Sequence, residues 1–173
     1  MNARVEAALN DQILKEASSS QYYLAMASWA ENNGLNGTSK FMYTHSDEEL
    51  FHMLKLVKFV NERGGRAIIP SISQPPTEFD NLKSVFELLL KHEISVTDSI
   101  NNLVDICLQE KDYTTHNFVQ WYVSEQLEEE ALARTILDKL KLIGDDNGGM
   151  YMFDRDLEAS VLAAPNATAD SKK

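Results

Sequence analysis

Four glutamates and one histidine in this sequence have the types and spacing needed to hold metal ions. Glu49 and His52 are three residues apart, so on a helix both side chains lie on one face and can share an ion. Glu16, Glu93 and Glu129 lie in three other segments, whose apolar residues repeat with a helical period. A carboxylate at a core position is costly unless a cation or hydrogen bonds compensate for it. We therefore expect a multivalent cation among these side chains.

The donor types indicate which metal to expect. Glu49 can bridge two ions, and Gln126, three residues before Glu129, adds another potential ligand. Oxygen-rich coordination with one imidazole favours iron or manganese over structural zinc, which prefers closed sets of Cys and His. The single cysteine, Cys107, lies in an apolar-periodic stretch and is expected to be a buried apolar residue. The sequence therefore predicts a site for two iron or manganese ions.

A second acidic group adjoins the first. Glu48 precedes Glu49, so its side chain points about 100° away around the helix and cannot duplicate the Glu49 ligand. With Glu125 and Glu128 it could form a third, looser and more solvated cation site on the inner flank of the bundle. We expect Glu130, at the end of the same acidic run, to lie on a solvated face.

Three further side chains near these glutamates carry less specific signals. We interpret His45, one turn before Glu49, as a structural or surface residue, and His92 in the same way. Tyr23 lies two turns after Glu16 on the same helical stripe. The sequence is compatible with Tyr23 either packing in the core or donating a hydrogen bond to a ligand.

The elements that must position these residues are long helices, because residues 1–33, 38–63 and 77–143 contain neither glycine nor proline. Thr38 or Ser39 is expected to cap the second helix. Thr114 or Thr115 is expected to cap the fourth, after a loss of apolar phase at 109–112. The first expected helix covers about 3–33, and the second runs from after Gly37 to Gly64. The third begins at about Asn81 and ends at the break at 109–112, and the fourth runs from that break to about 143. A short fifth helix is expected over 154–162.

The connection between the second and third helices is long and contains Pro70, Pro75 and Pro76. Its roughly 16 residues can span about 50 Å when extended, whereas a helix of about 26 residues is only about 39 Å long. The third helix can therefore start at the same end as the second and lie parallel to it. This predicts an all-α four-helix bundle with one long crossover and a short fifth helix, over residues 1–163, followed by a flexible tail over 164–173.

Charge and hydropathy exclude several classes of function. Across 173 residues the formal net charge is −11, which disfavours binding to nucleic acid or to anionic lipid. The first residues lack the pattern of a secretory signal, and no segment is apolar for long enough to span a membrane. We therefore expect a cytoplasmic protein that binds neither nucleic acid nor membranes.

The motifs resemble those of ferritins, and most closely those of bacterial non-haem ferritins. The resemblance runs from the first helix to the short fifth helix and rests on Glu16 with Tyr23, Glu48-Glu49-x-x-His52, Glu93 and the run 121–130. It implies a homo-oligomeric shell of twenty-four ferritin-like bundles. In such a shell Fe(II) is oxidised by O2 or H2O2 at a diiron ferroxidase centre within each subunit, and the product is stored as ferric mineral.

The resemblance also implies roles for individual residues. Tyr23 would take part in electron transfer, and Gln126 would lie beside the second iron. Leu50 stands where bacterioferritin carries its haem-binding methionine, so no haem is expected. The implied ligands are Glu16, Glu49 and His52 for the first iron, Glu49, Glu93 and Glu129 for the second, and Glu48, Glu125, Glu128 and Glu129 for a third site.

Two other functions remain compatible with the residues. One is a diiron peroxidase or oxidase that turns over without storing mineral, although the chain has no rubredoxin-like cysteine pairs to relay electrons. The other is a non-catalytic helical bundle that binds a partner. Iron storage with ferroxidase activity is the function that the motifs favour.

Overall fold

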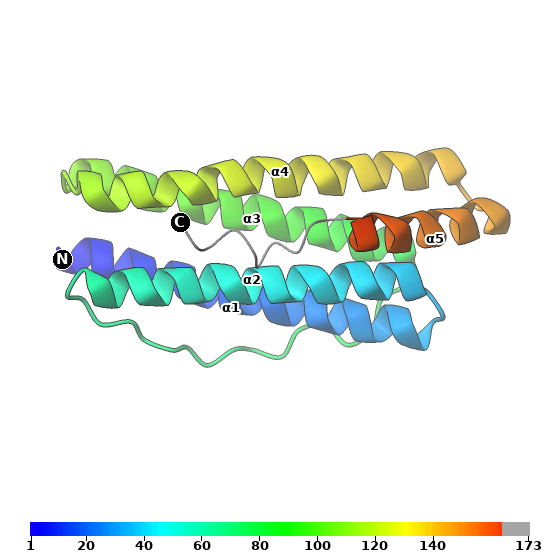
Figure 1. Cartoon of the computed structure of the whole chain (residues 1–173), viewed down its shortest axis with the longest axis horizontal. Coiled ribbons are helices and arrows are strands. Elements are labelled where there is room, and N and C mark those ends of the chain that lie inside the picture. Colours follow the sequence, from blue (N-terminus) through cyan, green and yellow to red (C-terminus); the bar gives the residue numbers. More distant parts are fainter. Residues whose placement is uncertain (164–173) are drawn as a thin grey trace.

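The computed structural model describes residues 1–163, and within this range it contains helices and no strands. The expected all-α bundle is confirmed, with four long helices and a shorter one (Figure 1). The tail expected over 164–173 lies outside the described residues. The helices are α1 (Ala3–Asn32), α2 (Asn36–Glu62), α3 (Leu82–Gln109), α4 (Tyr113–Ile143) and α5 (Asn147–Ala163).

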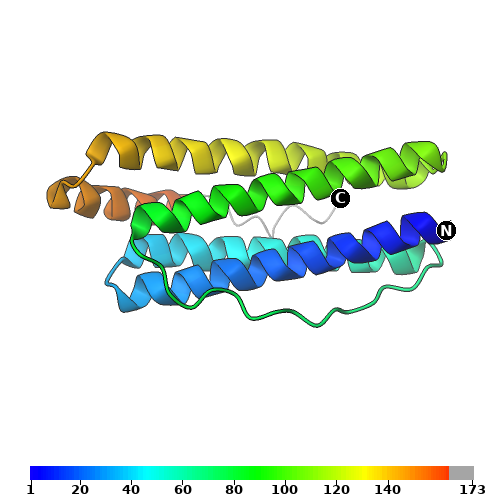
Figure 2. The same ribbon diagram turned by 180° about the vertical axis from the view of Figure 1, so that it is seen from behind.

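The long crossover between α2 and α3 runs along the side of the bundle from one end to the other (Figures 1 and 2). As predicted, α3 therefore starts at the end where α2 starts and runs parallel to it. Asn10 of α1 fastens the first part of the crossover. Its Nδ2 donates to the Arg66 carbonyl at 3.1 Å, and its Oδ1 accepts from the Ile68 N–H at 2.7 Å. The backbone of the crossover is thus tied to α1 by hydrogen bonds to the Asn10 side chain.

The start of α2 differs from the prediction. The helix begins at Asn36, and neither Thr38 nor Ser39 caps it with its side chain. The cap comes from α5 instead. The Asp154 carboxylate accepts hydrogen bonds from the Gly37 N–H at 2.9 Å and from the Thr38 N–H at 2.8 Å. Gly37 permits this contact, since a Cβ at that position would lie 1.7 Å from the Asp154 carbonyl oxygen.

The boundaries of α4 and α5 also differ from the prediction. Asp112, rather than Thr114 or Thr115, caps α4, because its carboxylate accepts from the Thr115 N–H at 3.0 Å. Arg63, at the end of α2, donates to the same carboxylate at 2.9 and 3.0 Å. The fifth helix starts at Asn147 rather than near residue 154, so two glycines predicted to precede it form its first turn.

Two apolar clusters fill the bundle, one toward each end. The first includes Phe41 and Phe86, and the second includes Leu56, Ile100 and the buried Cys107. On every long helix, a buried polar residue separates the part in one cluster from the part in the other. These residues are Glu16 on α1, Glu49 and His52 on α2, Glu93 on α3 and Gln126 on α4. The core therefore consists of two apolar halves with a polar layer between them.

Candidate metal centre

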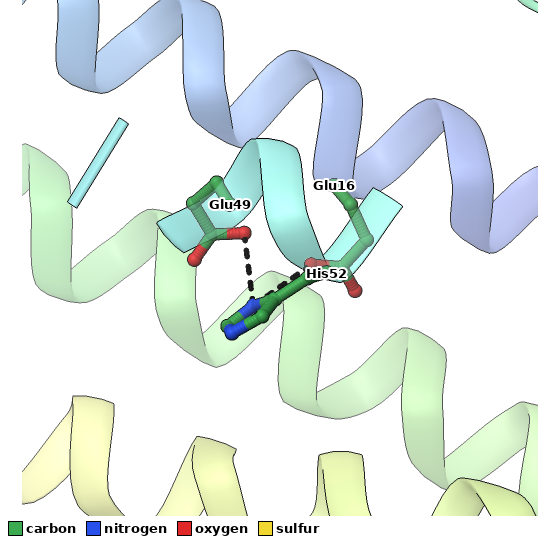
Figure 3. Close-up of side chains that lie close together, drawn as sticks. All are labelled: Glu16, Glu49 and His52. Atoms are coloured by element: carbon green, nitrogen blue, oxygen red, sulfur yellow. Dashed lines mark ion pairs between the residues drawn. The ribbon is translucent and has the colours of Figure 1, made fainter. Parts of the chain in front are cut away.

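Glu16, Glu49 and His52 form a compact, fully buried group in the polar layer (Figure 3). His52 Nδ1 lies 3.7 Å from Glu16 Oε2 and 3.6 Å from Glu49 Oε2, so one ring nitrogen faces both carboxylates. Exposed fractions are 1%, 3% and 5% in the same residue order. Each side chain offers one ligand atom to a region less than 4.8 Å across. Two helices, α1 and α2, thus bring two carboxylate oxygens and one imidazole nitrogen together in a buried site.

The pKa values of this group show how strongly burial and the neighbouring charges affect its histidine and glutamates. Burial alone would lower the pKa of His52, but the two neighbouring carboxylates raise it to about 10. Burial raises the pKa of Glu49 well above its ordinary value, and the Glu16 charge adds to that effect. Glu49 Oε2 is buried, and no group within residues 1–163 donates a hydrogen bond to it. The His52 nitrogen at 3.6 Å is too distant for a hydrogen bond, so this oxygen keeps a lone pair that a metal ion could take.

Glu93 lies in the same layer but outside this group of three, and its carboxylate is held by neutral donors. The Tyr23 hydroxyl donates to Glu93 Oε1 at 2.9 Å, and Gln126 Nε2 donates to Glu93 Oε2 at 3.0 Å. Burial raises the pKa of Glu93, and these two hydrogen bonds oppose that shift. The Tyr23 side chain packs in the first apolar cluster and its hydroxyl also donates to Glu93, so the structure combines core packing with a hydrogen bond. Gln126 here acts as a donor to a carboxylate.

A second group contains His45, for which the sequence predicts only a structural or surface role. His45 Nε2 lies 3.8 Å from Glu48 Oε2 and 3.9 Å from Glu129 Oε2. His45 Nδ1 lies 2.8 Å from the Phe41 carbonyl oxygen, which can only accept, so Nδ1 carries the hydrogen and Nε2 keeps its lone pair. Histidine ligands in metal sites commonly donate their other N–H to a backbone carbonyl in this way. The spacing His45-x-x-Glu48, which reverses Glu49-x-x-His52, is the signal that could have identified His45.

The acidic run of α4 does not behave as one surface. Burial raises the pKa of Glu129 to about 8, and the Glu93 and Glu48 charges add to the effect. Glu125 is half-buried and Glu128 is exposed, and neither belongs to the two compact groups. Glu130 was expected on a solvated face, but it is half-buried, accepts from the Thr97 hydroxyl at 2.6 Å and pairs with Arg134.

The structure therefore gathers some predicted ligands more closely than others. Glu16, Glu49 and His52, expected around a first ion, are together. Of the ligands expected around a second ion, Glu93 is hydrogen-bonded to its neighbours and Glu129 lies nearer to His45 and Glu48.

Comparison with known proteins identifies the family. The family model described as a ferritin-like domain matches residues 6–143. The chain belongs to the ferritin family. A probable bacterial non-heme ferritin-like protein of Haemophilus influenzae is 46% identical over 149 residues, which cover 86% of this chain and 90% of the relative. A bacterial non-heme ferritin of Campylobacter jejuni is 44% identical over 155 residues, covering 90% and 93% respectively.

Solved ferritin structures are similar to this chain in both fold and sequence. An open-pore ferritin from the hyperthermophilic archaeon Archaeoglobus fulgidus superposes with a TM-score of 0.90 at 44% identity. The match covers 91% of this chain and 97% of that one. The recognition of a ferritin-type bundle from its motifs is therefore confirmed. No helix within residues 1–163 combines the length and apolar character needed to cross a bilayer.

Aromatic side chains enclose the His52 side of the layer in this member of the ferritin family. The Trp121 ring meets the His52 ring edge to face, with centroids 5.1 Å apart. The Tyr122 hydroxyl donates to the His52 carbonyl at 2.8 Å, which fixes this turn of α2 against α4. Lys55 Nζ lies 3.4 Å above the centre of the Trp121 ring. These contacts restrict the imidazole to the orientation in which Nδ1 faces the two carboxylates.

Proposed function

We propose that this protein oxidises Fe(II) and stores the ferric product. The observation that carries the proposal is the buried group of Glu16, Glu49 and His52, with an oxygen of Glu49 that lacks a donor among the described residues. Two carboxylates and an imidazole suit iron, and their burial makes binding of a divalent ion far more favourable than leaving them unpaired. Relatives that are named bacterial non-heme ferritins support iron as the metal.

We assign the second iron to Glu49, Glu93 and Glu129, with Glu49 bridging. When Fe(II) enters, its charge removes the repulsion that keeps these carboxylates apart, and Glu93 exchanges part of its hydrogen bonding for metal coordination. The Gln126 amide and the Tyr23 hydroxyl then hold the Glu93 carboxylate in position by hydrogen bonding. In this assignment the Tyr23 hydroxyl lies next to the second iron through its hydrogen bond to Glu93.

The reaction balances without any further redox group. Two Fe(II) ions give up two electrons, which with two protons reduce O2 to H2O2, or reduce H2O2 to two molecules of water. His52, protonated before iron binds because of its raised pKa, releases a proton when Nδ1 becomes a ligand. Glu129, with a pKa of about 8, is a further group that holds a proton near neutral pH. The site therefore releases protons when iron binds.

We assign the third site to His45, Glu48 and Glu129, with Glu125 and Glu128 on its more exposed side. Glu129 belongs to both the second and the third site. Ferric iron can therefore move from one site to the other while it stays bound to at least one carboxylate. This assignment adds His45 to the four glutamates expected from the sequence. Storage would take place in a shell of twenty-four copies of the chain.

The test is to add excess Fe(II) in air to the purified iron-free protein and separate it by size. Iron retained per chain and particle mass are then measured together. Retention of far more iron than the ligand groups can hold, in a particle of twenty-four chains, is the expected result. Retention of two or three irons per chain in a small oligomer would instead indicate a diiron oxidase or peroxidase. Unchanged iron uptake by Glu49→Ala would refute both.

A further inference from the structure

Gln12 is a buried polar residue of α1 that has no place in the ligand set described above. It lies one turn before Glu16, and only 1% of its surface is exposed. Its Nε2 donates to Glu16 Oε1 at 2.6 Å. A neutral amide in the apolar half of the bundle, between Leu9 and Ile13 in the sequence, thus contacts a candidate ligand directly.

This hydrogen bond divides the two oxygens of the Glu16 carboxylate between different partners. Oε1 is occupied by the Gln12 amide, whereas Oε2 faces His52 Nδ1 at 3.7 Å. The carboxylate plane is therefore fixed with one oxygen turned away from the metal position and the other turned toward it. A carboxylate held in this way offers one oxygen to an ion rather than two.

The other end of the Gln12 amide indicates that its role is not to stabilise the fold. Gln12 Oε1 is buried, and no group of the described chain donates a hydrogen bond to it. A buried acceptor left without a donor destabilises the folded state, and an apolar side chain of similar size would avoid that cost. The amide therefore has an effect at Glu16 that a leucine could not supply.

We propose that Gln12 is a positioning residue for the metal site, which holds Glu16 so that only Oε2 binds the ion shared with Glu49 and His52. The inference rests on the proposed function, because it assumes that this group binds a metal. Hydrogen bonds to ligating carboxylates orient them and reduce the freedom lost on binding. Gln12 thereby raises the affinity of the site and limits the coordination number of the ion.

The first test compares Gln12→Leu with a control one turn on the other side of Glu16. Ser20 is also buried, and its hydroxyl donates to the Ser46 carbonyl at 2.9 Å without contacting a candidate ligand. Zn2+, which is redox-inert, is titrated into the iron-free protein, and unfolding in urea is followed for each variant. Gln12→Leu should weaken the first Zn2+ binding event by about tenfold or more. Its urea midpoint should change little, because the variant loses the hydrogen bond to Glu16 but also loses the buried acceptor that has no donor. Ser20→Ala should lower the midpoint and leave Zn2+ affinity unchanged.

The second test reads the coordination directly with Co2+. If Gln12 restricts Glu16 to one oxygen, Gln12→Leu frees Oε1 to bind as well, and the coordination number of bound Co2+ rises. The visible absorption of Co2+ weakens as its coordination number increases, so the spectrum of Gln12→Leu should be weaker than that of the wild type. Ser20→Ala should give the wild-type spectrum.

The outcomes separate this inference from the function on which it rests. If Gln12→Leu binds Zn2+ as tightly as the wild type, or loses stability without losing affinity, Gln12 is only a structural residue and the inference is overturned. An unchanged Co2+ spectrum in Gln12→Leu would overturn the single-oxygen assignment. If the wild type and Glu49→Ala bind Zn2+ equally, the metal site itself is wrong, whatever Gln12 does.

Discussion

His45 and His52 lie two turns apart on α2, and each faces two glutamates, yet their electrostatic states are opposite. Carboxylates of Glu16 and Glu49 face His52 Nδ1 and raise the pKa of the ring to about 10. Burial lowers the pKa of His45 below its ordinary value, and the Glu48 charge only partly offsets this effect. Without metal, His52 is therefore an imidazolium near neutral pH and His45 is a neutral imidazole.

The difference shows that the same ligand types need not make equivalent metal sites. At His52, an incoming ion must replace a proton that already partly neutralises the glutamates, so binding depends strongly on pH. At His45, Nε2 already has a free lone pair because Nδ1 donates to the Phe41 carbonyl. The first site gains from deep burial and the second from a ligand that is ready to bind.

The largest effect should follow from replacing each histidine by leucine. In His52→Leu, Glu16 and Glu49 face each other without the imidazolium, and loss of one partner from a buried ionic group costs about 3–5 kcal/mol. We expect this loss in the urea unfolding free energy of the iron-free protein, at fixed protein concentration, together with loss of the tighter Zn2+ binding event. His45→Leu is the control and should keep the tighter event. Equal losses in the two variants would contradict the contrast.

A second effect concerns the pH dependence of stability. The folded-state pKa values of His52 (about 10) and Glu129 (about 8) are both raised, so their contributions are largest at low pH and are lost as pH rises. From pH 6 to pH 8 the unfolding free energy of the iron-free protein should fall by about 3 kcal/mol. His45, with its lowered pKa, acts in the opposite direction.

Urea unfolding at a series of pH values measures this dependence, and Glu129→Gln provides the comparison. The variant carries no ionisable group at position 129, so its stability should fall less steeply between pH 6 and pH 8. Zn2+ should reverse the trend, because the ion binds the deprotonated ligands. A wild-type protein that becomes more stable with rising pH in the absence of metal would disprove the assignment of protons to His52 and Glu129.

A smaller effect is expected at Glu93, which neither histidine contacts. Tyr23→Phe removes the hydroxyl that donates to Glu93 Oε1, and a hydrogen bond to a charged group contributes about 1.5–3 kcal/mol. We expect a loss of that size in urea unfolding. Tyr22→Phe is the matched control, because Tyr22 stacks on His92, with ring centroids 4.9 Å apart, and has no bond to Glu93. Similar losses in the two variants would show that Glu93 does not depend on Tyr23.

The smallest effect on the metal sites should come from the cap of α2. Asp154→Ala removes the acceptor for the Gly37 and Thr38 N–H groups, and loss of such a cap costs about 1 kcal/mol. Zn2+ binding at both sites should be unchanged, since neither histidine group includes residues of α5. Thermal unfolding and Zn2+ titration of the variant measure the two properties. Weakened Zn2+ binding would show that the end of the bundle is coupled to its centre.

Much of the fold and part of the site could be predicted from residues that are close in the sequence. Glycines end helices because they adopt positive φ, and Gly34 and Gly64, both at φ 73°, follow α1 and α2 as expected. Glu49 and His52 were predictable as a pair because a three-residue step on a helix fixes their relative direction. Glu16 joined them because its depth along α1 matches theirs.

Features that depend on distant residues could not be predicted in the same way. The role of His45 depends on which ring nitrogen is free and on Glu129 arriving from α4. The cap of α2 was assigned to nearby Thr38 or Ser39, because side chains of that type commonly cap helices, but Asp154 displaced them from α5. Gln12 carries no ligand-type signal, and only its burial and its contact with Glu16 distinguish it.

The contact between Asp154 and α2 also constrains when the fold can be completed during synthesis. Gly37 and Asp154 are separated by 117 positions. A ribosome that adds about 5–20 residues per second needs roughly 6–23 s to cover that interval. For the whole of that time the N–H groups of the first turn of α2 lack their acceptor, although the helix itself is fully synthesised once Glu62 has been added. Docking of the last helix is therefore the event that completes the second one, and a chain released before residue 154 would carry an uncapped α2.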